Sequence, residues 1–201
     1  MSYELTLGAI YLGANRCRFK VWAPYARAVA LHLVAPEDRI VPLEPTGRGY
    51  YQAVVTDVRP GTRHFYLLDG KKERPDPASR YQPEGVHGPS AVVDLTGQLW
   101  PDEGWRSHQQ EEELIFYELH VGTFTPEGTF QALIPHLPEV VELGVTAVEL
   151  MPVAQFPGSR NWGYDGVYPF AVQNTYGGPH ALRQFVAACH QQGLSVFLDV
   201  V

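Results

Sequence analysis

The stretch between Met151 and Pro179 carries the side chains best suited to binding a small molecule. Connections between a strand and the next helix usually span about 2–6 residues, and much longer ones are either functional or disordered. Disordered segments avoid aromatic residues, whereas this stretch holds six. We therefore predict an ordered binding surface here. Its aromatic residues are Phe156, Trp162, Tyr164, Tyr168, Phe170 and Tyr176.

The elements around this stretch alternate between buried strands and helices. Apolar runs of strand length cover residues 114–121, 145–150 and 194–201, and apolar residues recur with helical spacing over 130–141 and 179–192. Pro135 and Pro138 predict that the first helix is kinked or split, because proline removes a backbone donor. Gly144 and Gly193 are expected to end the two helices. The β-α-β-α-β order predicts parallel neighbouring strands.

Polar residues follow the predicted strands at their C-terminal ends, with His120 after the first and Asp199 in the third. The glycines that follow Val121 fit neither a dinucleotide-binding nor a P-loop pattern, which disfavours a Rossmann fold. In a (β/α)8 barrel the active site is built from the loops at the C-terminal strand ends. His120, the 152–178 loop and Asp199 are therefore expected to meet on this edge, which we call the rim. His190, on the second helix, is expected to lie away from the rim and in solvent.

In the first half of the chain, apolar residues recur at every second position instead of with helical spacing. Residues 16–22 alternate charged and apolar side chains, and short β-rich runs separated by Pro and Gly turns follow. This spacing predicts a β-sandwich over residues 1–97. A Pro- and Gly-rich crossing segment at 75–89 is expected to be ordered. Residues 98–113, with Trp100 and Trp105 among charges, are expected to link the sandwich to a second domain at 114–201.

Bulk composition limits the function classes. The net charge is −7, from 22 acidic and 15 basic residues, and no basic run predicts nucleic-acid binding. Cys17 and Cys189 lie far apart in apolar patterns, as expected of two buried reduced thiols. We see no signal peptide and no apolar run long enough to cross a membrane, so we expect a cytoplasmic protein. We expect no metal ion and no cofactor.

Several motifs together resemble the α-amylase superfamily of glycoside hydrolases. They also resemble, within it, the branch that holds glycogen branching enzymes and malto-oligosyltrehalose trehalohydrolases. The resemblance covers nearly the whole chain, most closely from Pro75 onward, and favours the trehalohydrolases. The matching stretches are residues 80–89, 117–130, 149–153, 162–167 and 198–201.

The resemblance implies an immunoglobulin-like, glucan-binding type of module followed by the first three strands of a (β/α)8 barrel. It further implies that Tyr164 stacks on the sugar at the reacting position. Asp165 would bind sugar hydroxyls or hold the loop through backbone N–H groups, and Trp162 would form a sugar platform or an apolar lid. Asp199 would steady the rim, and His120 would make a structural hydrogen bond. These five residues are the predicted substrate-binding set.

The resemblance also places the catalytic carboxylates after the fourth, fifth and seventh barrel strands, which this sequence does not reach. We therefore expect no catalytic residue in the chain and no hydrolase activity from these 201 residues alone. The implied reaction is hydrolysis of the α-1,4 bond next to the trehalose end of malto-oligosyltrehalose. The alternatives are a glucan branching enzyme, which usually carries Gln where this chain has Asp165, and a non-catalytic glucan-binding module.

Overall fold

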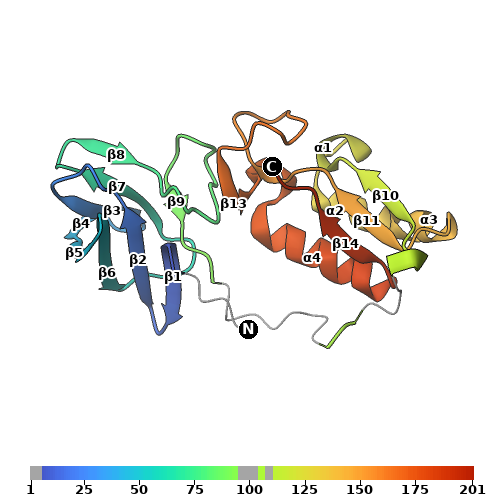
Figure 1. Ribbon diagram of the computed structural model, residues 1–201, viewed down its shortest axis with the longest axis horizontal. Coiled ribbons are helices and arrows are strands. Elements are labelled where there is room, and N and C mark those ends of the chain that lie inside the picture. Colours follow the sequence, from blue (N-terminus) through green and yellow to red (C-terminus); the bar gives the residue numbers. More distant parts are fainter. Residues whose placement is uncertain (1–5, 95–103, 107–110) are drawn as a thin grey trace. The chain divides into compact units, whose positions relative to one another are not determined.

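The computed structural model describes residues 6–94, 104–106 and 111–201 (Figure 1). The chain divides into two compact units, Met1–Gln98 with Tyr168–Ala171 and Leu99–Val167 with Val172–Val201. Most of the predicted 98–113 linker, including Trp100, lies outside the described residues. Within the described part of the chain, no helix is long and apolar enough to cross a membrane.

The first unit is built from two antiparallel sheets around one apolar core, as the period of two predicts. One sheet has the order β1-β2-β6-β5 and consists of β1 (Gly8–Gly13), β2 (Arg16–Trp22), β6 (Tyr50–Thr56) and β5 (Glu44–Gly47). The other has the order β4-β3-β7-β8, with β9 also on β7, and consists of β4 (Arg39–Pro42), β3 (Val29–Ala35), β7 (Arg63–Leu68), β8 (Lys72–Arg74) and β9 (Ser90–Ala91). Both sheets supply side chains to the core, such as Phe19 and Leu31, which are fully buried.

A histidine on the second sheet is held between two carboxylates. His32 Nδ1 contacts Glu73, and its Nε2 lies 3.0 Å from Asp38 Oδ1. The hydrogen bond to Glu73, followed by that to Asp38, raises the pKa of His32 above its ordinary value. Protonated His32 is therefore better stabilised in the folded protein than in the unfolded chain.

The 75–89 segment is ordered, as predicted, and buried polar side chains fix its path. Ser90 Oγ accepts a hydrogen bond from the Asp76 amide, and the Gln82 side chain accepts from both Ser79 and Ser90. Tyr168 packs with Val86 in a small buried cluster and donates to the Val86 carbonyl at 2.9 Å. This contact explains why Tyr168–Ala171 groups with the first unit, although its sequence neighbours belong to the second.

The second unit contains the predicted parallel strands. They are β10 (Phe116–Leu119), β11 (Ala147–Leu150) and β14 (Ser195–Leu198), in the order β10-β11-β14. All three are in step, because Phe116 pairs with Ala147 and Ala147 with Ser195. The first strand is shorter than predicted, and the one-turn helix α1 (Val121–Phe124) follows directly after His120. The 3-10 turn η1 (Glu111–Glu113) precedes β10.

The predicted first helix is split, as its prolines require. It consists of α2 (Phe130–Leu133), the 3-10 turn η2 (Ile134–His136) and α3 (Leu137–Glu142). Pro135 lies in the 3-10 turn and Pro138 in the first turn of α3, where its missing N–H costs least. Gly144 then adopts φ = +83°, a conformation that favours glycine.

The second helix, α4 (Gly178–Gln191), begins with Pro179 in its first turn and is followed by Gly193 at φ = +79°, as predicted. Phe185 and Cys189 on one face are fully buried in the core of the unit. The prediction that His190 lies in solvent was wrong, because the residue is half-buried. Its ring stacks on Trp105 with centroids 3.7 Å apart and planes within 2°, because the aromatic faces shield each other from water.

The stretch between β11 and α4 is ordered and carries short elements of its own. These are β12 (Ala154–Gln155) and β13 (Tyr168–Val172), which form a two-stranded sheet, and the 3-10 turn η3 (Asn174–Tyr176). Gln155 and Gln173 are fully buried and bind backbone groups at the base of the loop. These bonds leave residues 157–167 as the outer part of the loop, which we call the rim loop.

Candidate functional site

The three parallel strands place their following residues on one edge, as the rim prediction requires. His120 follows β10, the long connection that carries the rim loop follows β11, and Asp199 follows β14. Because the strands pair in register, these segments start at the same level of the sheet. The rim is therefore built from residues that are far apart in sequence.

His120 joins the first of these segments to the rim loop. Its Nε2 lies 2.7 Å from the carbonyl oxygen of Asn161 and 3.2 Å from the Tyr176 hydroxyl, while its Nδ1 lies 3.2 Å from the Thr123 hydroxyl. A carbonyl can only accept, so Nε2 carries a proton and donates it to the Asn161 oxygen. Both ring nitrogens are thus engaged within the protein. Burial raises the pKa of Tyr176 to about 12, so its hydroxyl stays neutral.

Asn161 organises the tip of the rim loop, and sequence reasoning missed it. Its Oδ1 accepts from the amide of Gly163 at 2.8 Å and from the amide of Asp165 at 3.4 Å. Its Nδ2 donates to Asp165 Oδ2 at 2.8 Å. The Asp165 carboxylate therefore holds the loop through a side-chain amide rather than through backbone N–H groups. The signal was present, because asparagine commonly bonds to the backbone two residues ahead in turns.

Gly163 is required at the centre of this turn. Its φ is +99°, and a Cβ at this position would lie 2.3 Å from the carbonyl oxygen of Pro152. Any other residue would force the loop away from the start of the β11–α4 connection.

Tyr164 and Asp199 meet across 35 positions of sequence. The Tyr164 hydroxyl donates to Asp199 Oδ2 at 2.8 Å, while nearly half of the tyrosine surface remains exposed. This hydrogen bond raises the pKa of Tyr164 above its ordinary value, because the carboxylate favours the protonated hydroxyl. The tyrosine is held by its polar end and leaves ring surface open to a ligand.

Trp162 lies on the other side of the loop tip. Its ring meets the edge of the His120 ring with centroids 5.7 Å apart and planes at 64°, and 68% of the residue is exposed. The two aromatic residues of the loop tip thus face solvent beside different strand ends.

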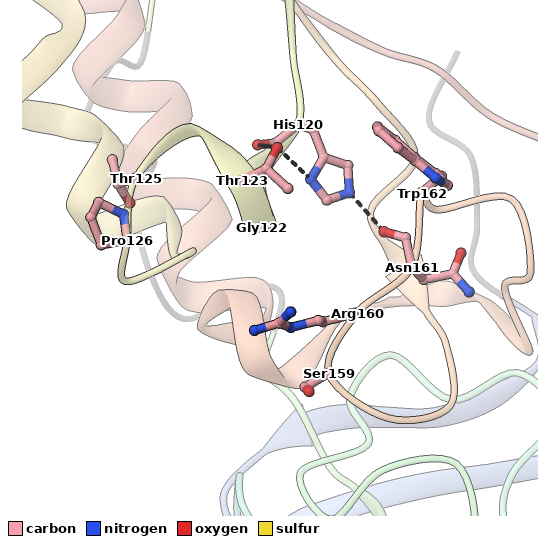
Figure 2. A pocket seen from close by; sticks show the side chains of 9 residues that line it. All are labelled: His120, Gly122, Thr123, Thr125, Pro126, Ser159, Arg160, Asn161 and Trp162. Atoms are coloured by element: carbon pink, nitrogen blue, oxygen red, sulfur yellow. Dashed lines mark hydrogen bonds between the residues drawn. The ribbon is translucent and has the colours of Figure 1, made fainter.

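A cavity of about 550 Å³ opens between α1 and the rim loop (Figure 2). It is lined by His120, Gly122, Thr123, Thr125, Pro126, Ser159, Arg160, Asn161 and Trp162. Two of the five predicted site residues, His120 and Trp162, line it, whereas Tyr164, Asp165 and Asp199 do not. Arg160, which was not predicted, extends into the cavity in Figure 2. Among the described residues, no group of three His, Cys, Asp or Glu side chains is placed to hold a metal ion.

The chain matches two protein families. Residues 93–201, just over half of the chain, match the catalytic domain of alpha amylase, and residues 6–82 match carbohydrate-binding module 48, the isoamylase N-terminal domain. The chain is 51% identical over 183 residues to the malto-oligosyltrehalose trehalohydrolase of Saccharolobus solfataricus, which covers 91% of this chain and 32% of that protein. It is 35% identical over 226 residues to the branching enzyme GlgB of Bacillus caldolyticus, covering 100% of the chain and 33% of that protein.

Solved structures show the same fold. A candidate alpha amylase from Salmonella typhimurium superposes with a TM-score of 0.91 at 44% identity, over 98% of this chain and 33% of that one. A pullulanase from Anoxybacillus, crystallised with maltotetraose, superposes with a TM-score of 0.82 at 28% identity, over 99% of this chain and 35% of that one. The chain spans about a third of the length of the curated relatives that it matches. Its strand order, its rim and its sequence lead to one conclusion, which is that the chain belongs to the alpha-amylase family.

Proposed function

We propose that the protein to which these residues belong hydrolyses the α-1,4-glucosidic bond next to the trehalose end of malto-oligosyltrehalose and releases trehalose. The observation that carries the proposal is the Tyr164–Asp199 pair on the rim, in a chain that is 51% identical to a protein named as this trehalohydrolase. We further propose that residues 1–97 form an immunoglobulin-like module, that 98–113 link it to the barrel, and that residues 114–201 supply the first three strands of the barrel.

The chain's own residues would bind and orient the sugar. The Tyr164 ring would lie against the apolar face of the reacting glucose, which flattens as positive charge develops in the transition state. A contact that improves on flattening lowers the barrier, whereas one already complete in the ground state only tightens binding. Asp199 would hold the tyrosine hydroxyl, and Asn161 and Asp165 would hold the loop. We assign no proton transfer or nucleophilic attack to a residue of this chain.

The proposal is tested by giving the full-length protein purified malto-oligosyltrehalose and measuring the trehalose released. We expect release in a stoichiometric ratio to the shortened malto-oligosaccharide, and none from the 201-residue polypeptide alone. Malto-oligosaccharides without a trehalose end serve as the matched substrate control and should be cut far more slowly. Equal rates on both substrates would contradict the proposed specificity.

The similarity to a branching enzyme favours a second candidate, a transferase that forms branches on α-glucan. The same preparation should therefore be incubated with linear glucan and analysed for new branch points. Asp165, where branching enzymes usually carry Gln, speaks for the hydrolase. Branch formation without trehalose release would establish the transferase instead. Asp165→Gln should lower trehalose release if this side chain supports the hydrolase site.

A further inference from the structure

Three buried side chains of the first unit carry polar atoms that have no partner among the described residues. His64 and Tyr66 lie two positions apart on β7 and both face the core, and Asp76 lies in the 75–89 segment. Each of the three is only 1% exposed. Both ring nitrogens of His64, the Tyr66 hydroxyl and Asp76 Oδ2 lack a hydrogen bond within the described part of the chain. Such atoms are rare in native proteins, so three of these side chains in one core need an explanation.

The three side chains lie close to one another. His64 Nε2 is 3.6 Å from Asp76 Oδ2, which is too long for a hydrogen bond, and the His64 and Tyr66 rings meet edge to face with centroids 5.9 Å apart. Burial, and after it the negative charge of Asp76, raises the pKa of Tyr66 well above its ordinary value, so the hydroxyl keeps its proton. Polar groups separated by slightly more than a hydrogen bond are often bridged by water.

The other polar atoms around Asp76 are already engaged. Asp76 Oδ1 accepts from the Ala78 amide at 2.9 Å, and the Asp76 amide donates to Ser90 Oγ at 2.9 Å. Arg80 donates to two backbone carbonyls next to the start of β1, at 3.1 and 3.2 Å. Asp76 Oδ2 is therefore left without a donor among the described residues, although it is fully buried.

A water molecule matches the donors and acceptors of this group. It can donate to Asp76 Oδ2 and accept from the Tyr66 hydroxyl and from the His64 N–H, of which a neutral imidazole has one. Three hydrogen bonds are typical of a buried water molecule. An anion would be repelled by the Asp76 carboxylate, and an apolar group would leave all three side chains without a partner.

We propose that an ordered internal water molecule binds between His64, Tyr66 and Asp76 and joins the 75–89 segment to β7. The segment is already held by the side chains of Ser79, Gln82 and Ser90, and the water adds a link from Asp76 into the core of the sandwich. Further along the same segment, the Val86 carbonyl accepts from Tyr168. The water site thus helps to hold the segment on which Tyr168 packs.

The site itself is tested by a crystal structure of the full-length protein at a resolution that locates water molecules. We expect a density peak within about 3.2 Å of the Tyr66 hydroxyl, of Asp76 Oδ2 and of one His64 nitrogen. Tyr66→Phe, which removes only the hydroxyl, should weaken or abolish this peak. A direct hydrogen bond between His64 and Asp76 with no peak beside them would overturn the proposal. So would a peak whose distances identify a metal cation.

The role of the water is tested by hydrogen exchange of the Asp76 and Ala78 amides in the same protein. Tyr66→Phe and His64→Phe both keep an aromatic ring, and each should speed exchange at these amides by about 5- to 10-fold. Because the two side chains share one water molecule, the double variant should speed exchange by less than the product of the two effects.

The matched control is Tyr51→Phe, because the Tyr51 hydroxyl, in the same core, donates directly to the Ala26 carbonyl at 2.8 Å. This variant should leave exchange at Asp76 and Ala78 unchanged, alone or combined with His64→Phe. Unchanged exchange in Tyr66→Phe and His64→Phe would overturn the proposed role of the water. Effects of these two substitutions that multiply fully would overturn it as well.

Discussion

Removing the Asn161 side chain should disorder the tip of the rim loop. The Asn161→Ala variant loses the bond from the Gly163 amide at 2.8 Å, which is partly buried, and the exposed bond to Asp165 at 2.8 Å. A typical net value is about 0.5–1.5 kcal/mol for each, with the exposed bond at the low end. Together they amount to about 1–2 kcal/mol, or a factor of about 5–30 in favour of the ordered loop. The bond from His120 to the Asn161 carbonyl is retained, so the backbone at residue 161 should stay attached to the end of β10.

The assay is kcat/KM of the full-length protein, combined with hydrogen exchange of the backbone amides over residues 161–165. We expect Asn161→Ala to lower kcat/KM by up to about 30-fold and to speed exchange at Gly163 by a similar factor. If Asn161 acts through Asp165, its effect should shrink when Asp165 is already alanine. Fully additive effects of the two substitutions would contradict this coupling.

Asn161→Asp separates the two bonds. It keeps an oxygen that accepts from Gly163, but it places a second carboxylate beside that of Asp165, and like charges at hydrogen-bond distance repel. The deficit of this variant relative to the wild type should therefore be largest at neutral pH and should shrink as the pH falls and the pair takes up a proton. Wild-type kcat/KM and unchanged Gly163 exchange in Asn161→Ala would refute the reasoning as a whole.

Three further predictions concern separate parts of the molecule. Tyr164→Ala should lower kcat/KM by about 30- to 1,000-fold, with much of the loss in kcat, whereas Tyr164→Phe keeps the ring, loses only the bond to Asp199 and should lower kcat/KM by about 10-fold or less. Kinetic constants measured per folded molecule check both variants, and an unchanged kcat/KM in Tyr164→Ala removes Tyr164 from the site. Because the pKa of His32 is raised in the folded state, its stabilising contribution is complete below about pH 6.5 and is lost as the pH rises through the folded pKa. The difference in unfolding free energy between the wild type and His32→Ala should therefore decrease over that range, and a difference that grows with pH would contradict the prediction. Burial raises the pKa of Cys17 and of Cys189 to about 12, so neither thiol should react with an alkylating reagent at pH 8 until the protein is denatured, as mass spectrometry can check.

The elements of the fold could be predicted because each depends on a local pattern. The alternation of charged and apolar residues predicted β2, and runs of apolar residues predicted β10, β11 and β14. The split of the helix after β10 followed from Pro135 and Pro138 alone, since a proline removes a donor in any surroundings. These signals need no knowledge of what packs against the element.

Part of the site could be predicted for a similar reason. Parallel strands bring their C-terminal ends to one edge, so His120 and Asp199 were placed on the rim without any contact being known. The partners of these side chains could not be predicted. Asn161 lies 41 positions from His120, and their bond depends on the path of a loop that follows no repeating pattern. The Trp105–His190 stack was missed because it joins a residue outside any helix or strand to a helix far along the chain, and no repeating pattern marks such a contact.

The length of the rim loop has a structural reason that connects these observations. A connection of about 2–6 residues after β11 would return directly to the helix and reach neither neighbouring strand. The long loop instead lies over both neighbours, with the Asn161 carbonyl bound by His120 after β10 and the Tyr164 hydroxyl bound to Asp199 after β14. Four consecutive residues thus bridge the ends of three strands. Gly163 allows this sharp course, because only a residue without a Cβ fits against Pro152. Trp162 and Tyr164 thereby stand exposed beside the ends of two different strands, one in contact with His120 and the other bound to Asp199.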